Sequence, residues 1–518
     1  MNFRTTLIRS SVILALIGAF FFLCATNAYS QNQHKKEIEI TRHEDRPVVE
    51  VRTELANYLF STEDGSIRSI FLHFASYGSK QAELVSGTAT NPETMERSYD
   101  QDAVFPGQLT SAEEDQLPSS YQVQLPSEKK YDQATISFVG ETDDLRVEKT
   151  YVIHNNPNYT IELDISLTNL SEEPLTMGDD NRLIVDEIGA RESTDDVSYL
   201  SDPNVRYIFD GEVSNSILAS GSYEKFGGAG LVGEDLVFFF KNNTQKAIKT
   251  TPNFSDGVLS FNLGEKELGA GDAEKHEFTI YGGRRRHVLL SNVGLASIDE
   301  IGLFSKLLVP VIGFLNQLYK WTGNYGWAII MFTVLIRILL YPLMKNMYRS
   351  MGKMQELQPK MEEIREEYED DRQKQQEAMM ELYKEEGVNP MGGCLPMFIQ
   401  LPILILLWRA ILYSAEQIHL SPGFLWLNDL SLHDPYYILV ALTVGIMIVQ
   451  QQLMQTPGGG GGQNKWMGLV FPLFMGVMLH NFPAGLWLYY FLTTLFQVGQ
   501  QSFINWEMEK QESEAEAT

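Results

Sequence analysis

A run of about 20 mostly apolar residues, from Tyr325 to Met344, constrains this chain most. At ~1.5 Å rise per residue, a helix of that length spans the ~30 Å hydrocarbon core of a bilayer. One charged residue, Arg337, lies in the inner part of the run, where a charge costs roughly 2.5–3.5 kcal/mol on insertion scales. Arg337 either snorkels to a head group or faces a hydrated cavity between helices. We expect the cavity, because other polar residues fall at the same depth.

Charge divides the chain into an acidic part and an apolar part. Residues 31–300 hold 47 acidic and 24 basic side chains, which disfavours nucleic acid binding there because phosphates are repelled. That part has no phosphate loop, nucleophile elbow or metal-spaced histidine set. The two cysteines, Cys24 and Cys394, both lie in apolar segments and build no metal site. We therefore predict no metal, no cofactor and no enzyme activity.

The N-terminal residues indicate export. Residues 1–30 combine two arginines, an apolar run and the exit Ala28-Tyr29-Ser30. This is the plan of a cleaved signal peptide, and an uncleaved transmembrane anchor fits as well. Both place the next segment of the chain outside the cytoplasm. The polar residues 31–47 are expected to form a tether.

Residues 48–297 are predicted to form one outer domain. Short alternating runs such as Tyr159–Ile165 lie between turn signals such as Asp64-Gly65. Period-two alternation with regular turns is typical of an antiparallel β-sandwich. The cluster Arg284-Arg285-Arg286 either contacts anionic head groups or is an ordinary surface cluster.

Two amphipathic helical regions flank the first span. Residues 301–321 place apolar side chains on one face and are expected to lie in the membrane interface. Residues 345–390 predict a helical hairpin, in which Pro359 starts or kinks a helix and Asp370-Asp371 marks a turn. Its Met-rich seam either packs the two helices together or offers an adaptable surface to hydrophobic segments.

Four further spans are predicted after the hairpin. They are Cys394–Leu412, Tyr436–Leu453, Trp466–Phe482 and Ala484–Ile504. Basic residues concentrate in loop 345–390 and are missing from loop 415–435. The positive-inside rule therefore places the hairpin and the C-terminus in the cytoplasm and the β domain outside.

Polar residues at matched depth predict a groove. Gln400 and Gln497 each lie six or seven residues from the cytoplasmic end of their spans, as Arg337 does. Either glutamine alone is more often a helix–helix contact. Together the three suggest a hydrated pocket that opens to the cytoplasm. The spans offer no acidic partner for Arg337, so we expect it to bind a carboxylate that arrives with a substrate. The predicted groove residues are Arg337, Thr333, Gln400, Thr443, Thr493 and Gln497.

Several motifs resemble those of the bacterial YidC membrane insertases. The most specific is Val388-Asn389-Pro390-Met391-Gly392-Gly393-Cys394, followed by Ile399-Gln400-Leu401-Pro402-Ile403. Further runs match in order: Leu357-Gln358-Pro359-Lys360, Asp429-Leu430-Ser431, Asp434-Pro435-Tyr436-Tyr437, Phe482-Pro483-Ala484-Gly485 and Tyr489-Tyr490. The matches cover roughly residues 300–507, and the β domain is similar in position and type to the periplasmic sandwich of Gram-negative members.

The resemblance implies a multi-pass inner-membrane insertase and chaperone with a helical core at residues 325–507. Its arginine, matched by Arg337, would attract the hydrophilic end of a nascent membrane protein. The apolar segment would then slide into the lipid bilayer along two of the helices. The slide residues implied are Pro402, Trp408, Phe471 and Met475. The Sec translocon is an expected partner.

The C-terminal tail departs from the pattern of the YidC family, and two alternative functions have sequence requirements of their own. Many relatives end in a basic tail, whereas residues 508–518 are acidic here, which disfavours ribosome docking by the tail. A small-solute transporter with Arg337 as an anion site would require repeat symmetry and broken helices, and neither stands out. A sugar-binding or enzymatic β domain would require aromatic residues and carboxylates clustered in one outer cleft.

Overall fold

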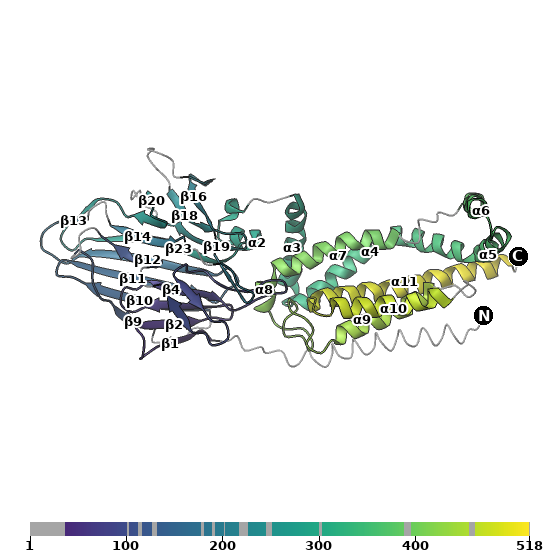
Figure 1. The fold of residues 1–518 in the computed structure, drawn as a ribbon, viewed down its shortest axis with the longest axis horizontal. Coiled ribbons are helices and arrows are strands. Elements are labelled where there is room, and N and C mark those ends of the chain that lie inside the picture. The colour runs from purple at the N-terminus through teal and green to yellow at the C-terminus, as the bar shows by residue number, and fades with distance from the viewer. Residues whose placement is uncertain are drawn as a thin grey trace. The chain divides into compact units, whose positions relative to one another are not determined.

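The computed structural model describes most of the chain. The described ranges are 37–100, 103–111, 116–126, 132–177, 181–188, 192–200, 202–216, 226–244, 251–299, 303–387, 395–454 and 462–516. They form two compact units, one within residues 34–302 and one within residues 303–518 (Figure 1). The predictions for residues 1–30, and the motif Val388–Cys394, lie outside the described residues.

The first unit is built on three larger sheets. The nine-stranded sheet has the order β17 (Glu212–Ser214), β16 (Asn204–Phe209), β18 (Phe226–Val232), β19 (Leu236–Asn242), β23 (Ala273–Arg284), β12 (Thr160–Asn169), β11 (Leu145–His154), β10 (Gln133–Glu141) and β9 (Gln122–Gln124). The six-stranded sheet has the order β1 (Glu39–Arg42), β2 (Val48–Arg52), β3 (Ala56–Ser61), β4 (Ile67–Leu72), β5 (Gln81–Glu83) and β15 (Val197–Tyr199). The four-stranded sheet has the order β20 (Thr251–Ser255), β21 (Val258–Asn262), β14 (Arg182–Glu187) and β8 (Leu109–Thr110).

Smaller elements complete this unit. Two two-stranded sheets pair β6 (Thr88–Thr90) with β7 (Arg97–Tyr99) and β13 (Leu175–Met177) with β22 (Lys266–Leu268). A short helix α2 (His287–Asn292) and a 3₁₀ turn η1 (Ala296–Ile298) follow the last strand.

Aromatic contacts between the sheets make the unit a sandwich. Phe60 of the six-stranded sheet lies 4.8 Å, between ring centroids, from Tyr151 of the nine-stranded sheet. Phe261 of the four-stranded sheet lies 5.8 Å from Phe278 of the nine-stranded one. Along β11, every second side chain is buried, because successive side chains of a strand point to opposite faces. The predicted antiparallel sandwich is confirmed, with one parallel pair, β5–β15, among the described strands.

A lysine lies inside this sandwich. Lys149 on β11 is fully buried, and its Nζ donates to the carbonyl oxygens of Asp64, at 2.6 Å, and Gly107, at 2.9 Å. Burial disfavours the charged ammonium and lowers the pKa of Lys149 to about 7. Unfolded lysine titrates near its ordinary value of 10.5. Between these two values the unfolded chain binds more protons, so the free energy of unfolding rises with pH.

We expect Lys149→Met to remove this rise, which amounts to at most about 1.4 kcal/mol per pH unit. The measurement is urea unfolding of the β unit within the full chain, at intervals from pH 7 to pH 10. Lys275→Met, at an exposed position of β23, is the control and should keep the rise. If the free energy of unfolding changed with pH in the same way for wild type and Lys149→Met, Lys149 would stay protonated in the folded protein.

The three consecutive arginines at the end of β23 serve the sandwich itself. Arg284 is 4% exposed, and its Nη2 donates to the carbonyl oxygens of Phe74 and Lys80. Arg285 Nε lies 3.2 Å from Asp299 Oδ1. Arg286 Nη2 donates to Ser76 Oγ at 3.2 Å. Buried Arg284 therefore fits neither interpretation of this cluster, whereas Arg285 and Arg286 are partly exposed, and a head-group contact by these two stays a prediction.

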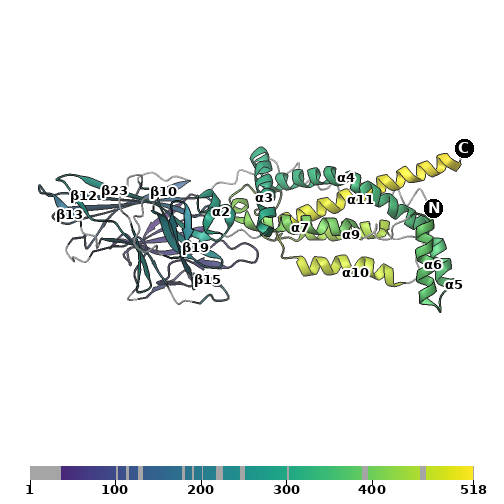
Figure 2. The ribbon, with the colours of Figure 1, turned by 90° about the horizontal axis from the view of Figure 1, so that it is seen from above.

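The second unit is a helical bundle. Its helices are α3 (Leu303–Thr322), α4 (Tyr325–Glu356), α5 (Gln358–Glu367), α6 (Arg372–Glu385), α7 (Leu395–Tyr413), α8 (Ala415–His419), α9 (Ile438–Met454), α10 (Gly462–Leu479) and α11 (Ala484–Glu516). Helices α4, α7, α9, α10 and α11 run side by side in both views (Figures 1 and 2). Helix α11 contacts α4, α7 and α9. The predicted fold class, a β-sandwich joined to a helical bundle, is confirmed.

The helices differ from the predicted spans in length. Among the described residues, one segment, Tyr325–Met347, is long and apolar enough to cross a membrane. Three shorter apolar segments are Phe398–Tyr413, Ile438–Gln452 and Leu469–Leu479. Helix α4 continues past the apolar run to Glu356, with Pro342 inside it, and ends before Pro359 of α5. Pro359 lies in the first turn of α5, and Asp371 caps α6.

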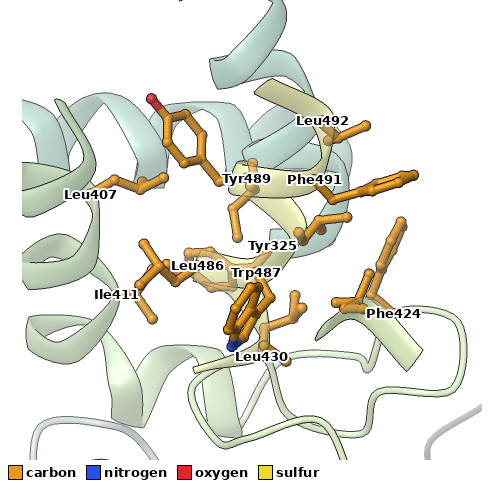
Figure 3. Packing of buried hydrophobic residues seen from close by; sticks show 14 of the residues in the cluster. Tyr325, Leu407, Ile411, Phe424, Leu430, Leu486, Trp487, Tyr489, Phe491 and Leu492 are labelled. Carbon is orange, nitrogen blue, oxygen red and sulfur yellow. The ribbon is translucent and has the colours of Figure 1, made fainter. Parts of the chain in front are cut away.

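An apolar core joins the helices at the end of the bundle that holds Tyr325 and Trp487 (Figure 3). The loop from α8 to α9 closes this core with Phe424 and Leu430. Asp434 anchors the loop, because its carboxylate accepts from the backbone nitrogens of Tyr436 and Leu439 and from Trp426 Nε1. The packed core at this end of the bundle therefore fixes the positions of the helices that surround Arg337.

Candidate functional site

Arg337 is a buried arginine of the helical unit. It lies on α4 within the apolar segment Tyr325–Met347 and is 8% exposed. Its Nη2 donates to Gln400 Oε1 of α7 at 3.0 Å. A buried guanidinium is expensive unless polar groups surround it. The neutral amide oxygen of Gln400 supplies one such group and does not itself cancel the positive charge.

Gln400 links Arg337 to a third helix. Its Nε2 donates to the Tyr489 hydroxyl oxygen at 2.6 Å. Tyr489 is 1% exposed, and its hydroxyl points away from Trp487 and Leu430 in the apolar core (Figure 3). The contacts thus run from α4 through α7 to α11. These two hydrogen bonds fix the orientation of the guanidinium, since the oxygen and the nitrogen of the Gln400 amide are both held.

A polar stripe continues along α11. Tyr489, Thr493, Gln497 and Gln501 follow at steps of four residues and are 1%, 1%, 8% and 3% exposed. Side chains four apart lie on one face of a helix. Gln497 Oε1 accepts from Gln450 Nε2 of α9 at 3.1 Å. One line of side chains on the buried side of α11 is therefore polar, beside apolar core residues such as Leu492 and Leu495.

The two predicted threonines outside α11 bond to their own helices. Thr333 Oγ1 donates to the carbonyl oxygen of Ile329, and Thr443 Oγ1 donates to that of Leu439, both at 2.7 Å. Both side chains are fully buried. Of the predicted groove residues, Arg337 and Gln400 meet directly, and Gln497 meets Gln450 instead.

Tyr489, Gln450 and Gln501 are polar residues of the site that sequence reasoning missed. Tyr489 lies in a motif that carried the family resemblance, and it precedes Thr493 and Gln497 at four-residue spacing. That spacing was the available signal. Gln450 lies in a run of three glutamines, Gln450 to Gln452, and nothing in the run distinguishes the one that turns inward. Arg409 of α7 is exposed and does not join these contacts.

The predicted slide residues lie on α7 and α10. Pro402 is exposed, and Trp408 is half-buried and stacks on Phe482 with ring centroids 5.2 Å apart. Phe471 is 47% exposed, and Met475 is half-buried. On the part of α10 whose side chains are described, the exposed apolar ones are Leu469, Val470, Phe471, Leu473, Phe474, Val477 and Met478. So much exposed apolar surface on one helix is typical of a membrane or protein contact.

Two observations in the described ranges bear on the alternative functions. Within the described ranges, no three His, Cys, Asp or Glu side chains come together as a metal ion would require. The β unit has a cavity of about 560 Å³ lined by Arg46, Ala89, Thr90, Asn91, Glu96, Arg97 and Ser98. This lining holds one carboxylate and no aromatic ring, unlike the cleft that the sugar-binding alternative requires.

Known proteins resemble the chain over most of its length. The family described as "60Kd inner membrane protein" matches residues 317–512. A protein of Syntrophus aciditrophicus (strain SB) named "Membrane protein insertase YidC" is 32% identical over 492 residues, which cover 91% of this chain and 85% of that protein. A protein of Neisseria gonorrhoeae (strain NCCP11945) with the same name is 40% identical over 48% of this chain and 46% of that protein.

A solved structure described as "Active YidC insertase crystal structure with the first transmembrane domain resolved" covers 95% of this chain and 98% of its own, with 23% identity and a TM-score of 0.49. The predicted family resemblance is confirmed by the sequence matches, which include the motifs at residues 317–512. The similarity to the Syntrophus protein extends through both units, since it covers 91% of this chain. The chain therefore belongs to the YidC family of membrane protein insertases.

Proposed function

We propose that this chain inserts proteins into the inner membrane and acts as their chaperone. Its relatives are named insertases. The observation that carries the mechanism is the buried guanidinium of Arg337, which donates to Gln400 Oε1 at 3.0 Å. A fixed positive charge of this kind binds an arriving carboxylate more strongly than water-exposed charges do, because the surroundings screen it less.

The polar side chains of α11 extend this site into a groove. Thr493 and Gln497, with Thr333 on α4 and Thr443 on α9, offer oxygen and amide groups to a peptide backbone that has left water. This reduces the cost of carrying hydrophilic residues into the bilayer. The apolar segment of the substrate then leaves along α7 and α10, past Pro402, Trp408, Phe471 and Met475. Its burial in lipid supplies the driving force, so no nucleotide is needed.

The arrangement implies a topology and partners. Residues 345–390 and the C-terminus lie in the cytoplasm, and the β unit lies in the periplasm, as the distribution of basic residues favours. Nascent membrane proteins and the lipid bilayer are the direct partners, and the Sec translocon is a further one. The acidic residues 508–518 disfavour docking of ribosomal RNA by the tail.

Complementation tests the function. The wild-type chain is expected to restore growth and membrane insertion in a bacterium depleted of its own insertase. The readout is protease protection of a single-span protein with an acidic periplasmic tail. Empty vector is the control. Failure to rescue, despite normal membrane expression, would contradict the proposal and favour an anion transporter that uses Arg337.

A conservative change at Tyr489 tests the groove geometry. Tyr489→Phe removes the oxygen that accepts from Gln400 Nε2, so the amide is released and no longer holds the guanidinium. A lost hydrogen bond of about 1 kcal/mol predicts roughly fivefold slower insertion. Tyr490→Phe, the adjacent tyrosine, is the matched control and should insert at the wild-type rate. Equal rates in both variants would show that Gln400 is oriented without Tyr489.

A further inference from the structure

A second positive site lies on α4 beyond Arg337. Lys345 Nζ is 3.3 Å from Glu507 Oε2 of α11, and Arg349 Nη2 is 3.2 Å from Glu507 Oε1. The three side chains are 29%, 40% and 27% exposed, so water and solutes reach them. Two cations share one carboxylate, which leaves a net positive charge.

Packing, and not the ion pairs, holds the two helices together here. Met344 and Met347 of α4 form a small apolar cluster with Ile504 of α11, and they are 1%, 5% and 0% exposed. Partly exposed ion pairs contribute only about 0–1 kcal/mol. The cations can therefore exchange Glu507 for another carboxylate while the helices stay in contact.

The site lies further along the same helix as Arg337. Lys345 and Arg349 follow Arg337 by eight and twelve residues on one continuous helix, or ~12 Å and ~18 Å at ~1.5 Å per residue. An extended peptide covers ~12 Å in about four residues. One acidic segment can thus reach both positive sites.

We propose that Lys345 and Arg349 form a binding site for the carboxylates of an acidic substrate segment, and that Glu507 occupies this site until the substrate replaces it. This rests on the proposed insertase function. The site receives the acidic segment first and passes it to Arg337. Glu507 competes with the substrate for the two cations and is always at hand, because it belongs to the same protein. A segment therefore needs more carboxylates to enter the site. The site thereby contributes to specificity, since neutral segments gain nothing from it.

The test uses the full chain in proteoliposomes and two single-span substrates that differ only in their tails, one with three Asp and one with three Asn. We expect Lys345→Gln/Arg349→Gln to slow the acidic substrate roughly tenfold and the neutral one less than twofold. Glu507→Gln should speed the acidic substrate about threefold in low salt, and this gain should vanish at high salt. Equal effects on both substrates, or slowing of the acidic one by Glu507→Gln, would overturn the proposal.

A charge-reversed variant separates binding from folding. Lys345→Glu/Arg349→Glu/Glu507→Arg keeps opposite charges in contact but presents net negative charge to the substrate. We expect it to slow the acidic substrate and leave the neutral one unchanged. Insertion of both substrates at the wild-type rate would overturn the proposed binding site. A wild-type chain that inserts neither substrate contradicts the insertase function itself, which distinguishes the two failures.

Discussion

Arg337→Ala is expected to reduce insertion of a protein with an acidic tail by about 10- to 100-fold, whereas Arg337→Lys retains most of it. Alanine removes the charge that binds the arriving carboxylate and leaves Gln400 Oε1 without the donor at 3.0 Å. A hydrogen bond to a charged group contributes about 1.5–3 kcal/mol, which corresponds to this range. Lysine keeps the charge as a point donor but loses the planar fork of the guanidinium.

The measurement is pulse-labelled insertion in the insertase-depleted strain, with membrane expression of each variant checked. Arg409→Ala removes an exposed arginine of α7 and should insert normally, which separates the buried charge from charge in general. Full insertion by Arg337→Ala would contradict the charge-based groove and leave the apolar surfaces of α7 and α10 to account for the activity.

Asp434→Ala should be the most destabilising single change in the helical unit. The side chain is fully buried and accepts from three donors, at 2.8 Å from Leu439 N and at 3.1 Å from both Tyr436 N and Trp426 Nε1. Alanine leaves these buried donors unsatisfied and removes a helix cap, which costs about 3–5 kcal/mol. Asp434→Asn keeps an acceptor oxygen and should cost much less.

Thermal unfolding of the detergent-solubilised full chain measures this, with the tryptophan fluorescence of the helical unit as the signal. His433→Ala, at the exposed neighbouring position, is the control and should unfold with the wild type. If Asp434→Ala also unfolded at the wild-type midpoint, the loop from α8 to α9 would owe its order to apolar packing of Phe424 and Leu430 alone.

The sequence predicted the fold class because the relevant signals are local. Alternation along Leu145–His154 and the apolar run at Tyr325–Met344 depend on side-chain periodicity within one element. The order of the strands within each sheet did not follow from this periodicity. The parallel pairing of β15 with β5 joins segments more than a hundred residues apart, and no pattern within either three-residue strand encodes its partner.

The candidate site was predicted in part for the same reason. The depth of Arg337 and Gln400 is a count along each span, and the two side chains meet in the structure. The contact of Gln497 with Gln450, and that of Gln400 with Tyr489, depend on how each helix is rotated about its axis. Counting residues along a span does not show how that helix is rotated about its axis. The functional role of these residues remains a prediction that the Arg337 and Tyr489 variants test.

By itself, the sequence determined the apolar spans, the buried arginine, the acidic β unit and the acidic C-terminal tail. Only the tertiary structure decided which groups those charges meet. It gave Arg337 a neutral amide as its neighbour and gave Lys345 and Arg349 the carboxylate of Glu507, about 160 residues away. Hydrogen bonds and ion pairs form within about 3–4 Å, and such closeness depends on the rotation and offset of packed helices.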